Sequence, residues 1–190
     1  MKNPNLTVRR AGPSDYAAIE RLAAKYYRGN LSPEEQKEGF LSAQLSLGQI
    51  AAMGDDLGIV VAMDQEKAVA FACASRSDFQ DQPPIVRHML GELARFQFMA
   101  QPMVIKDVFV YGPVCIDAAY RGLGLLRKMY EQMKEQVSIY PLGIAFVADD
   151  NPASMGAHIH GLGMQAVGRF DYLGKDFQAL AFGTRPGESC

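Results

Sequence analysis

Apolar and polar residues recur along the chain with a period of two in some stretches and of three to four in others, and these periods predict its elements. The first helix should be capped by Ser14 or Asp15, because both side chains can accept a hydrogen bond from its first turn. Ser32 precedes a proline and two acidic residues, which is typical of a second helix start. The expected elements of this half are a strand at 6–11, a helix at 12–27, a helix at 32–53, and two antiparallel strands at 57–77 that turn at 64–67.

The second half begins with a segment at 77–101 that we interpret as an insertion carrying a helix at 85–100. The next strand, 102–116, contains Gly112 and Pro113, which should interrupt its ladder because proline has no N–H and glycine tolerates a bulge. A clear amphipathic helix follows at 124–137, with an apolar stripe of Leu126, Met129, Tyr130, Met133 and Val137. The remaining expected elements are an apolar strand at 142–149 parallel to the preceding strand, a short helix at 151–161 and two closing strands at 164–182.

This order, β-α-α-β-β, an inserted helix, then β-α-β-α-β-β, predicts an α/β protein with a central mixed sheet flanked by helices. The chain has 190 residues, 48% of them hydrophobic, which is enough for one well-buried domain and short for two. We therefore expect a single domain over 1–190 with an insertion at 77–101.

Charge and cysteine content narrow the class of protein. There are 19 basic and 21 acidic residues without a long run of either sign, so we expect no nucleic-acid partner. The N-terminal residues contain no apolar run of the kind that targets export, and no uncharged apolar stretch is long enough to span a bilayer, so we expect no membrane partner. The cysteines Cys73, Cys115 and Cys190 are widely spaced, which indicates neither a disulfide framework nor a metal site and favours a cytoplasmic location.

The stretch VCIDAAYRGLGLL, residues 114–126, joins a strand to the start of the strong helix. Unpaired backbone N–H groups at a helix start form an anion site, glycines let the backbone approach a ligand, and Arg121 adds a positive charge. The dinucleotide fingerprint is excluded because Arg127 stands where a third glycine would be, and the P-loop is excluded because no Gly-Lys-Ser/Thr ending is present. A plain glycine turn remains the alternative to a pyrophosphate site.

These residues resemble the GNAT superfamily of acyl-CoA-dependent N-acyltransferases, whose loop has an arginine or glutamine, a glycine three positions on and a small residue two further. Arg121 and Gly124 match, and Leu126 departs from the final small residue. The resemblance implies a GNAT fold and acetyl-CoA as acyl donor, without a metal. It implies that the backbone of Val114, Cys115 and Ile116 binds the pantetheine arm and polarises the thioester carbonyl. It also implies that the pyrophosphate is held by Arg121, Gly122, Leu123, Gly124, Leu125 and Leu126.

A second matching region follows the apolar strand at 142–149. Asn151, Ser154 and the Leu-Gly-Met ending at 162–164 match the family pattern with one extra residue, which implies cofactor contacts from Asn151 and Ser154. Seven residues after the asparagine the family often has a tyrosine that protonates the departing thiolate, and here that residue is His158. Histidine can transfer protons near neutral pH, and His160 is the neighbouring candidate. Either histidine could equally be a solvated surface residue.

If the resemblance holds, a primary amine of a small molecule, amino acid or peptide attacks the thioester directly. Its proton needs an acceptor, for which Asp107, Tyr111 and Asp117 are the nearby candidates. Asp117 could instead form a turn, and Tyr111 could instead be a packing residue. Cys115 has no recognisable base partner, so we do not expect a covalent acyl-enzyme.

Two other functions remain open: a GNAT-fold module that binds acyl-CoA without turnover, and an α/β protein that binds a different phosphate ligand. The insertion carries Met89, Phe96, Phe98 and Met99. It could cap an acceptor pocket, form the face of a homodimer, or simply cover a bare part of the sheet.

Overall fold

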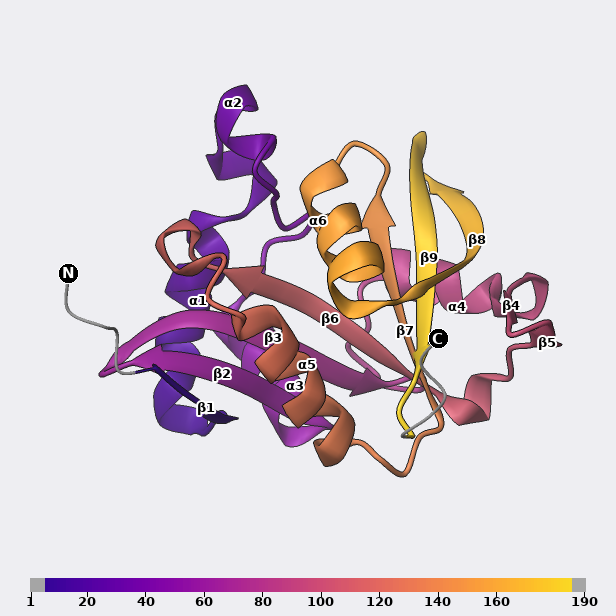
Figure 1. The fold of residues 1–190 in the computed structure, drawn as a ribbon, viewed down its shortest axis with the longest axis horizontal. Helices are drawn as coiled ribbons and strands as arrows, with labels where there is room; N and C mark the ends of the chain where they lie inside the picture. The colour runs from indigo at the N-terminus through magenta and orange to yellow at the C-terminus, as the bar shows by residue number, and fades with distance from the viewer. Residues whose placement is uncertain (1–5, 186–190) are drawn as a thin grey trace.

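The computed structural model describes residues 6–185, in which one seven-stranded sheet runs through the molecule (Figure 1). Its order is β1-β2-β3-β6-β7-β9-β8, with β6 and β7 parallel and all other neighbours antiparallel. The strands are β1 (Leu6–Arg10), β2 (Gly58–Asp64), β3 (Lys67–Arg76), β6 (Val108–Ile116), β7 (Leu142–Ala148), β8 (Gln165–Tyr172) and β9 (Lys175–Gly183). The predicted mixed sheet, including its parallel pair, is confirmed.

Helices cover both faces of this sheet, as predicted. Figure 1 shows α5 and α6 in front of the sheet and α1, α3 and α4 behind it. Successive residues of β2 point to opposite faces, so Val60 packs beneath α5 while Ile59 and Val61 pack beneath α1 and α3. The helices are α1 (Tyr16–Lys25), α2 (Pro33–Gln36), α3 (Leu47–Asp55), α4 (Pro84–Gly91), α5 (Leu125–Gln136) and α6 (Pro152–Gly156).

The helix expected at 32–53 is wrong as a single element, because the structure divides it into α2 and α3. Ser32 caps α2 as predicted, but the chain reaches Gly39 with φ of +103°, a left-handed conformation that ends the helix and suits glycine. A second capping box begins α3, in which the Ser46 side chain accepts from the Gln49 N–H. The residues between the two helices form neither helix nor strand, apart from a single parallel bridge between Leu41 and Tyr27.

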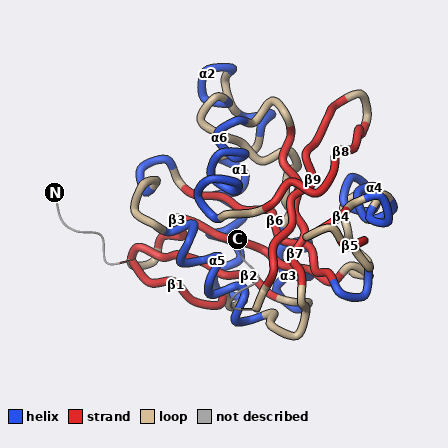
Figure 2. Tube along the Cα trace, turned by 45° about the vertical axis from the view of Figure 1, so that its right-hand side comes forward, coloured by secondary structure: helices blue, strands red, loops and turns tan. Residues whose placement is uncertain are grey.

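The insertion forms a cover over the C-terminal part of the sheet rather than one long helix. After α4 the chain makes a small hairpin of β4 (Gln97–Phe98) and β5 (Gln101–Pro102), which Figure 2 shows beside β8. Met89, Phe96 and Phe98 are buried in the cluster beneath this cover, and the Phe96 ring occupies the space where Gly168 on β8 lacks a side chain. Covering a bare part of the sheet is thus one role of this segment, and of Met89, Phe96, Phe98 and Met99 only Met99 is exposed.

The strand expected at 102–116 begins later, at Val108, because residues Ile105–Asp107 form a 3-10 turn. Its predicted interruption is confirmed: Gly112 has φ of +122°, and the register against β3 shifts between Ala72 and Ala74. Within residues 6–185, no helix is long and apolar enough to cross a membrane.

Candidate active site

The strands β6 and β7 are paired only at one end. Parallel pairing joins Val108–Val110 to Leu142–Ile144, whereas β6 remains paired with β3, and β7 with β9, well beyond that point. The distortion at Gly112 and Pro113 falls where β6 and β7 separate, and proline offers no N–H to continue the ladder. The facing edges of the two strands therefore diverge and leave backbone groups without a partner strand.

Two cavities meet at this divergence. The first, of about 590 Å³, lies against residues 121–127 and α6, and we call it the glycine-loop cavity. The second, of about 460 Å³, lies against residues 79–86 and the ends of β6 and β7, and we call it the insertion cavity. Five residues line both cavities: Phe40, Leu41, Val114, Ser154 and His158. These shared residues make the two cavities direct neighbours, and we call the region that the two cavities occupy the cleft.

The loop between β6 and α5 has the conformation that its glycines allow. Gly122 and Gly124 have φ of +77° and +74°, and a Cβ added at either position would meet no atom within 4 Å. Glycine is therefore needed at these two positions for its left-handed backbone conformation and not because a side chain would lack space. Gly124 is the N-cap residue of α5, so the first N–H groups of this helix have no partner within it and lie beside the cavity. The loop therefore has the left-handed glycines and the open helix start on which the predicted anion site depends.

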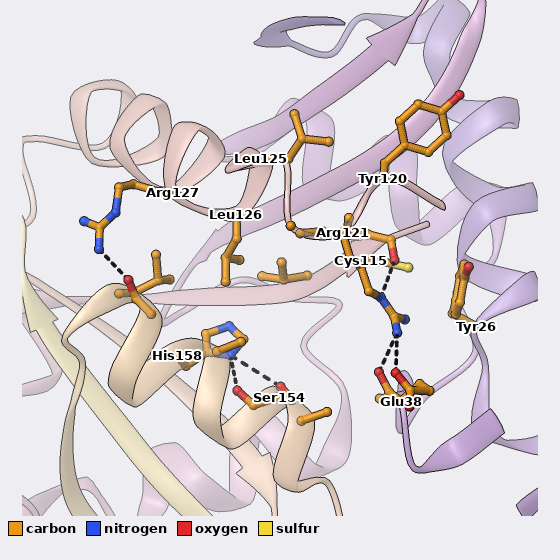
Figure 3. A pocket seen from close by; sticks show the side chains of 18 of the residues that line it. Tyr26, Glu38, Cys115, Tyr120, Arg121, Leu125, Leu126, Arg127, Ser154 and His158 are labelled. Atoms are coloured by element: carbon orange, nitrogen blue, oxygen red, sulfur yellow. Dashed lines mark hydrogen bonds and ion pairs between the residues drawn. The ribbon is translucent and has the colours of Figure 1, made fainter. Parts of the chain in front are cut away.

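Two arginines stand beside this loop (Figure 3). Arg121 Nη1 donates to the Glu38 carbonyl at 2.7 Å, and its guanidinium lies 5.5 Å from the centre of the Tyr26 ring. Arg127 donates to the carbonyl of Gly161, and so joins α5 to the end of the helix that follows β7. No local pattern in the sequence reveals the contact of Arg127 with Gly161.

Most residues predicted to bind the acyl donor lie together, and two do not. Those lining the glycine-loop cavity are Val114, Cys115, Ile116, Arg121, Gly122, Gly124, Leu125, Leu126 and Ser154. Leu123 does not line it, and its side chain is 46% exposed. Asn151 lines the insertion cavity instead, where it caps α6 by accepting from the Ser154 N–H.

The structure corrects the stripe that was predicted for α5. Leu125, rather than Leu126, is buried with Met129, Tyr130 and Met133. Leu126 is half-buried beside the cavity (Figure 3). Its side chain therefore borders the glycine-loop cavity while packing against the edge of the core.

His158 lies at the junction of the two cavities. The segment Ala157–Gly161 is a π-helical turn, which takes up one more residue than an α-helical turn and so explains the extra residue in the sequence pattern. The ring is 8% exposed, and Nδ1 lies 2.8 Å from the Ser154 carbonyl oxygen (Figure 3). Because a carbonyl can only accept, Nδ1 carries the proton and Nε2 keeps its lone pair. Burial lowers the pKa of His158, against a smaller opposing effect of this hydrogen bond, so the ring is neutral at pH 7.

The other proton-transfer candidates, Asp107, His160 and Tyr111, differ from His158 in position or in protonation state. Asp107 lines neither cavity, since it precedes β6 at the end remote from the divergence, and His160 is exposed and also lines neither. Tyr111 lines the insertion cavity with its ring edge-on to His158, but burial raises the pKa of its hydroxyl far above neutrality. That hydroxyl has no hydrogen-bond partner within residues 6–185. Asp107 is therefore too remote from the cavities to act as a base there, and the Tyr111 hydroxyl stays protonated at neutral pH.

Asp117 has the structural role that the sequence analysis gave as the alternative to accepting a proton. Its carboxylate accepts from the Ala119 N–H and lies 3.0 Å from Lys25 Nζ and 3.6 Å from Lys67 Nζ. Burial alone would raise the pKa of Asp117, but these partners together hold it below its ordinary value. A permanently charged, paired carboxylate at the start of the loop fixes the loop rather than moving protons.

The segment between α2 and α3 is a functional element that the sequence did not reveal. Its residue Phe40 lines both cavities, and the carbonyl of Phe40 accepts from Asn151 Nδ2 at 3.1 Å. On the other side of the cleft, Arg121 holds the neighbouring Glu38 carbonyl. Arg28 adds an ion pair to Asp150 at 2.7 Å and lies over the Phe40 ring. Residues 38–41 are therefore held in place by hydrogen bonds from Arg121 on one side of the cleft and from Asn151 on the other.

Residues 6–185 contain no cluster of three or more His, Cys, Asp or Glu side chains that could hold a metal ion. Cys73 and Cys115 are free and buried, and Cys190 lies outside the described residues.

Comparison with known proteins shows that this chain is similar to solved structures in fold, but it finds no match in sequence. No family model and no curated protein matches the sequence. Among solved structures, an N-acetyltransferase from Staphylococcus aureus is 16% identical, with a TM-score of 0.61 over 95% of this chain and 99% of that one. A GNAT superfamily phosphinothricin acetyltransferase from Sinorhizobium meliloti, solved with acetyl-CoA, is 15% identical, with a TM-score of 0.61 over 94% and 88%. A ribosomal-protein-alanine N-acetyltransferase from Brucella melitensis is 16% identical, with a TM-score of 0.57 over 92% and 98%.

These structures share the mixed sheet and its flanking helices with this chain over nearly its whole length. The chain therefore has the GNAT fold, as its sequence predicted.

Proposed function

We propose that the protein is an N-acetyltransferase that moves the acetyl group of acetyl-CoA to a primary amine by direct attack. The observation that carries this proposal is the position of His158, a buried and neutral histidine shared by two cavities that meet where β6 and β7 diverge. One cavity suits an activated acyl donor and the other an acceptor, so a proton-transferring group lies where the two would react.

The glycine-loop cavity suits the acyl donor. Its helix N-terminus, its two left-handed glycines, Arg121 and Arg127 together suit a pyrophosphate. Beyond them, β6 from Val114 to Ile116 offers backbone groups to an extended pantetheine arm, as the family resemblance implies. Acetyl-CoA supplies a thioester, whose carbonyl those backbone N–H groups would polarise.

The structure changes the role that we assign to His158. The sequence suggested an acid, but a neutral ring with a free Nε2 must first accept a proton. We assign it both steps: the amine nitrogen forms a bond to the carbonyl carbon and loses a proton to Nε2, then the carbon–sulfur bond breaks and the thiolate receives that proton. The products are an N-acetyl amide and CoA thiol, so atoms and charges balance.

The fold does not select the acceptor. Structures of this fold include enzymes named for phosphinothricin and for the alanine of a ribosomal protein, so their names point to no single acceptor. The two competing functions are a module that binds acyl-CoA without turnover and a protein that binds another phosphate ligand. A homodimer and a cytoplasmic location remain predictions from the sequence.

The test combines binding and turnover. Calorimetry with acetyl-CoA should show binding, and release of CoA thiol, followed with a thiol reagent, should depend on an added primary amine. Binding without amine-dependent release would favour the non-catalytic module. A thermal shift with nucleotides but not with acetyl-CoA would contradict the proposal and favour the other phosphate ligand.

A further inference from the structure

The walls of the insertion cavity are largely apolar. They are contributed by the segment before α3, by α3 itself, by the insertion and by the sheet: Leu45, Met53, Phe79, Val86, Val110 and Phe177. All but Phe79 are buried, and Phe79 is half-buried. A cavity of about 460 Å³ with such walls gains free energy from an apolar group that enters it, on the order of 25 cal/mol for each Å² removed from water.

Charge is confined to the rim of this cavity. Three charged residues line it: Arg28 is paired with Asp150 at 2.7 Å, and Asp81 and Lys175 are exposed. Within residues 6–185, therefore, no buried carboxylate lines it. A strongly basic alkylamine such as the lysine side chain, with a pKa of about 10.4, stays an ammonium ion at neutral pH and gains no buried counter-charge here. An α-amine beside a carbonyl, with a pKa of about 7.7 to 8.0, is neutral in a substantial fraction.

A buried neutral side chain, Gln82, offers a polar group to this cavity. Gln82 is 4% exposed, and its Nε2 donates to Ser75 Oγ at 2.9 Å and to the Arg76 carbonyl at 2.9 Å. The Arg76 carbonyl can only accept, which fixes the orientation of the amide. Gln82 Oε1 receives no hydrogen bond within residues 6–185. The atom keeps some accessible surface, and because Gln82 lines this cavity, Oε1 is open to it. The Tyr111 hydroxyl is also unpartnered within residues 6–185, but it is fully enclosed and does not face the cavity.

We propose that the acceptor is a peptide-type α-amine that carries an apolar side chain, an inference that rests on the proposed function. The apolar side chain lies against Met53, Phe79 and Val86, and Gln82 Oε1 accepts a hydrogen bond from an N–H of the acceptor. The amine itself lies toward His158, which lines this cavity as well as the glycine-loop cavity. It enters uncharged, forms the new N–C bond and loses one proton to Nε2.

A panel of four amines separates the two parts of this proposal. Leucine amide has the weakly basic α-amine and the apolar side chain, glycine amide has only the amine, 3-methylbutylamine has only the side chain, and Nα-acetyl-lysine amide presents a strongly basic amine. With the whole protein and saturating acetyl-CoA at neutral pH, we expect kcat/KM for leucine amide to exceed each of the others about tenfold or more. Preference for 3-methylbutylamine or the lysine derivative, or equal rates for the two amides, would overturn the proposal.

Failure of the underlying function has a different outcome. If acetyl-CoA binds and none of the four amines increases CoA release, the proposed function fails together with this inference. If one of the other amines is the best substrate, the function stands and only the acceptor class is wrong.

A wall variant tests where the side chain binds. Phe79→Ala removes a half-buried ring from the cavity, so we expect kcat/KM for leucine amide to fall about tenfold while that for glycine amide changes less than about twofold. Ile139→Ala, which truncates an apolar side chain that is 82% exposed and lines neither cavity, serves as the control. An equal loss for both amides in Phe79→Ala would place the side chain elsewhere and contradict the proposal.

Discussion

The Nδ1 atom of His158 donates to the carbonyl oxygen of Ser154 at 2.8 Å, and this contact within one helical segment orients the histidine ring. Since the acceptor is a backbone carbonyl, the tautomer with a free Nε2 is set by the fold of α6 and its π-helical turn. The contact is thus what makes His158 a proton acceptor first and a proton donor second.

Replacing this histidine should separate chemistry from binding. His158→Gln keeps a polar side chain but cannot titrate, so we expect kcat/KM to fall about 10² to 10⁴-fold with the Kd for acetyl-CoA nearly unchanged. Ser154→Ala is the matched comparison, because it removes a hydroxyl at 3.4 Å from Nδ1 but keeps the carbonyl, and it should cost far less. An equal loss in both variants would argue against a proton-transfer role.

The buried histidine should also make stability depend on pH. Its pKa in the folded state lies below the ordinary value near 6.5, so below that pH the unfolded chain binds a proton that the folded chain does not. Stability should therefore fall as the pH drops from about 6.5 toward the folded-state pKa, by at most about 1.4 kcal/mol per pH unit. The ring faces Tyr111 of β6 and the Ser154 carbonyl and hydroxyl of its own helix, all uncharged at these pH values.

Urea unfolding of the native sequence and His158→Gln at several pH values measures this effect. The difference in unfolding free energy between the two proteins should change in favour of the variant as the pH falls below 6.5. A difference that stays constant with pH would mean that the histidine is accessible and titrates normally.

Arg121 should contribute to acetyl-CoA binding by charge and by holding residues 38–41. Arg121→Gln removes the charge and the hydrogen bond to Glu38, and we expect affinity to weaken about tenfold with a smaller dependence on salt. Lys128→Gln provides the control, since it makes the same charge change on an exposed residue of α5 that lines neither cavity. Calorimetry at low and high salt measures the acetyl-CoA affinity of both variants. Equal losses of affinity in Arg121→Gln and Lys128→Gln would indicate a general charge effect.

Cys115 should be dispensable for chemistry. It lines the glycine-loop cavity, but burial raises the pKa of its thiol to about 12, so the nucleophilic thiolate is not formed at neutral pH. Cys115→Ala should keep kcat within a few-fold, because the backbone groups of this strand remain. Intact mass spectrometry after incubation with acetyl-CoA should show no acetylated protein, and a stable adduct lost in the variant would contradict direct attack.

The parts of the fold that follow from local pattern were predictable. The apolar runs of β2 and β3, the interruption at Gly112, the glycine loop before α5 and the cap at Asn151 all depend on residues that are close together in the sequence. The extra residue after Asn151 was visible as well, although only the structure shows that a π-helical turn absorbs it.

The parts of the site that depend on distant contacts were not predictable. The bond from Asn151 to the Phe40 carbonyl spans 111 positions, and that from Arg121 to the Glu38 carbonyl spans 83. Apolar spacing continued through residues 32–53 as if in one helix, and only Gly39 and the Ser46 capping box signalled the break that brings Phe40 to both cavities. Gln82 likewise looked like part of a loop, since nothing nearby in sequence shows that it would be buried against Ser75.

Leu126 gives the sharpest test of how the glycine loop meets its ligand. Its side chain is half-buried beside the cavity, at the position where the GNAT resemblance implies a small residue, while Leu125 is fully buried in the core. Leu126→Ala shortens the side chain without the loss of helix propensity that glycine would bring, about 1 kcal/mol. We expect acetyl-CoA to bind at least as tightly to this variant as to the native protein, with little change in stability. Leu125→Ala is the matched comparison and should destabilise the fold by about 2 to 5 kcal/mol. Clearly weaker acetyl-CoA binding by Leu126→Ala would show that the leucine contacts the ligand favourably, and that bulk at this position is part of the site.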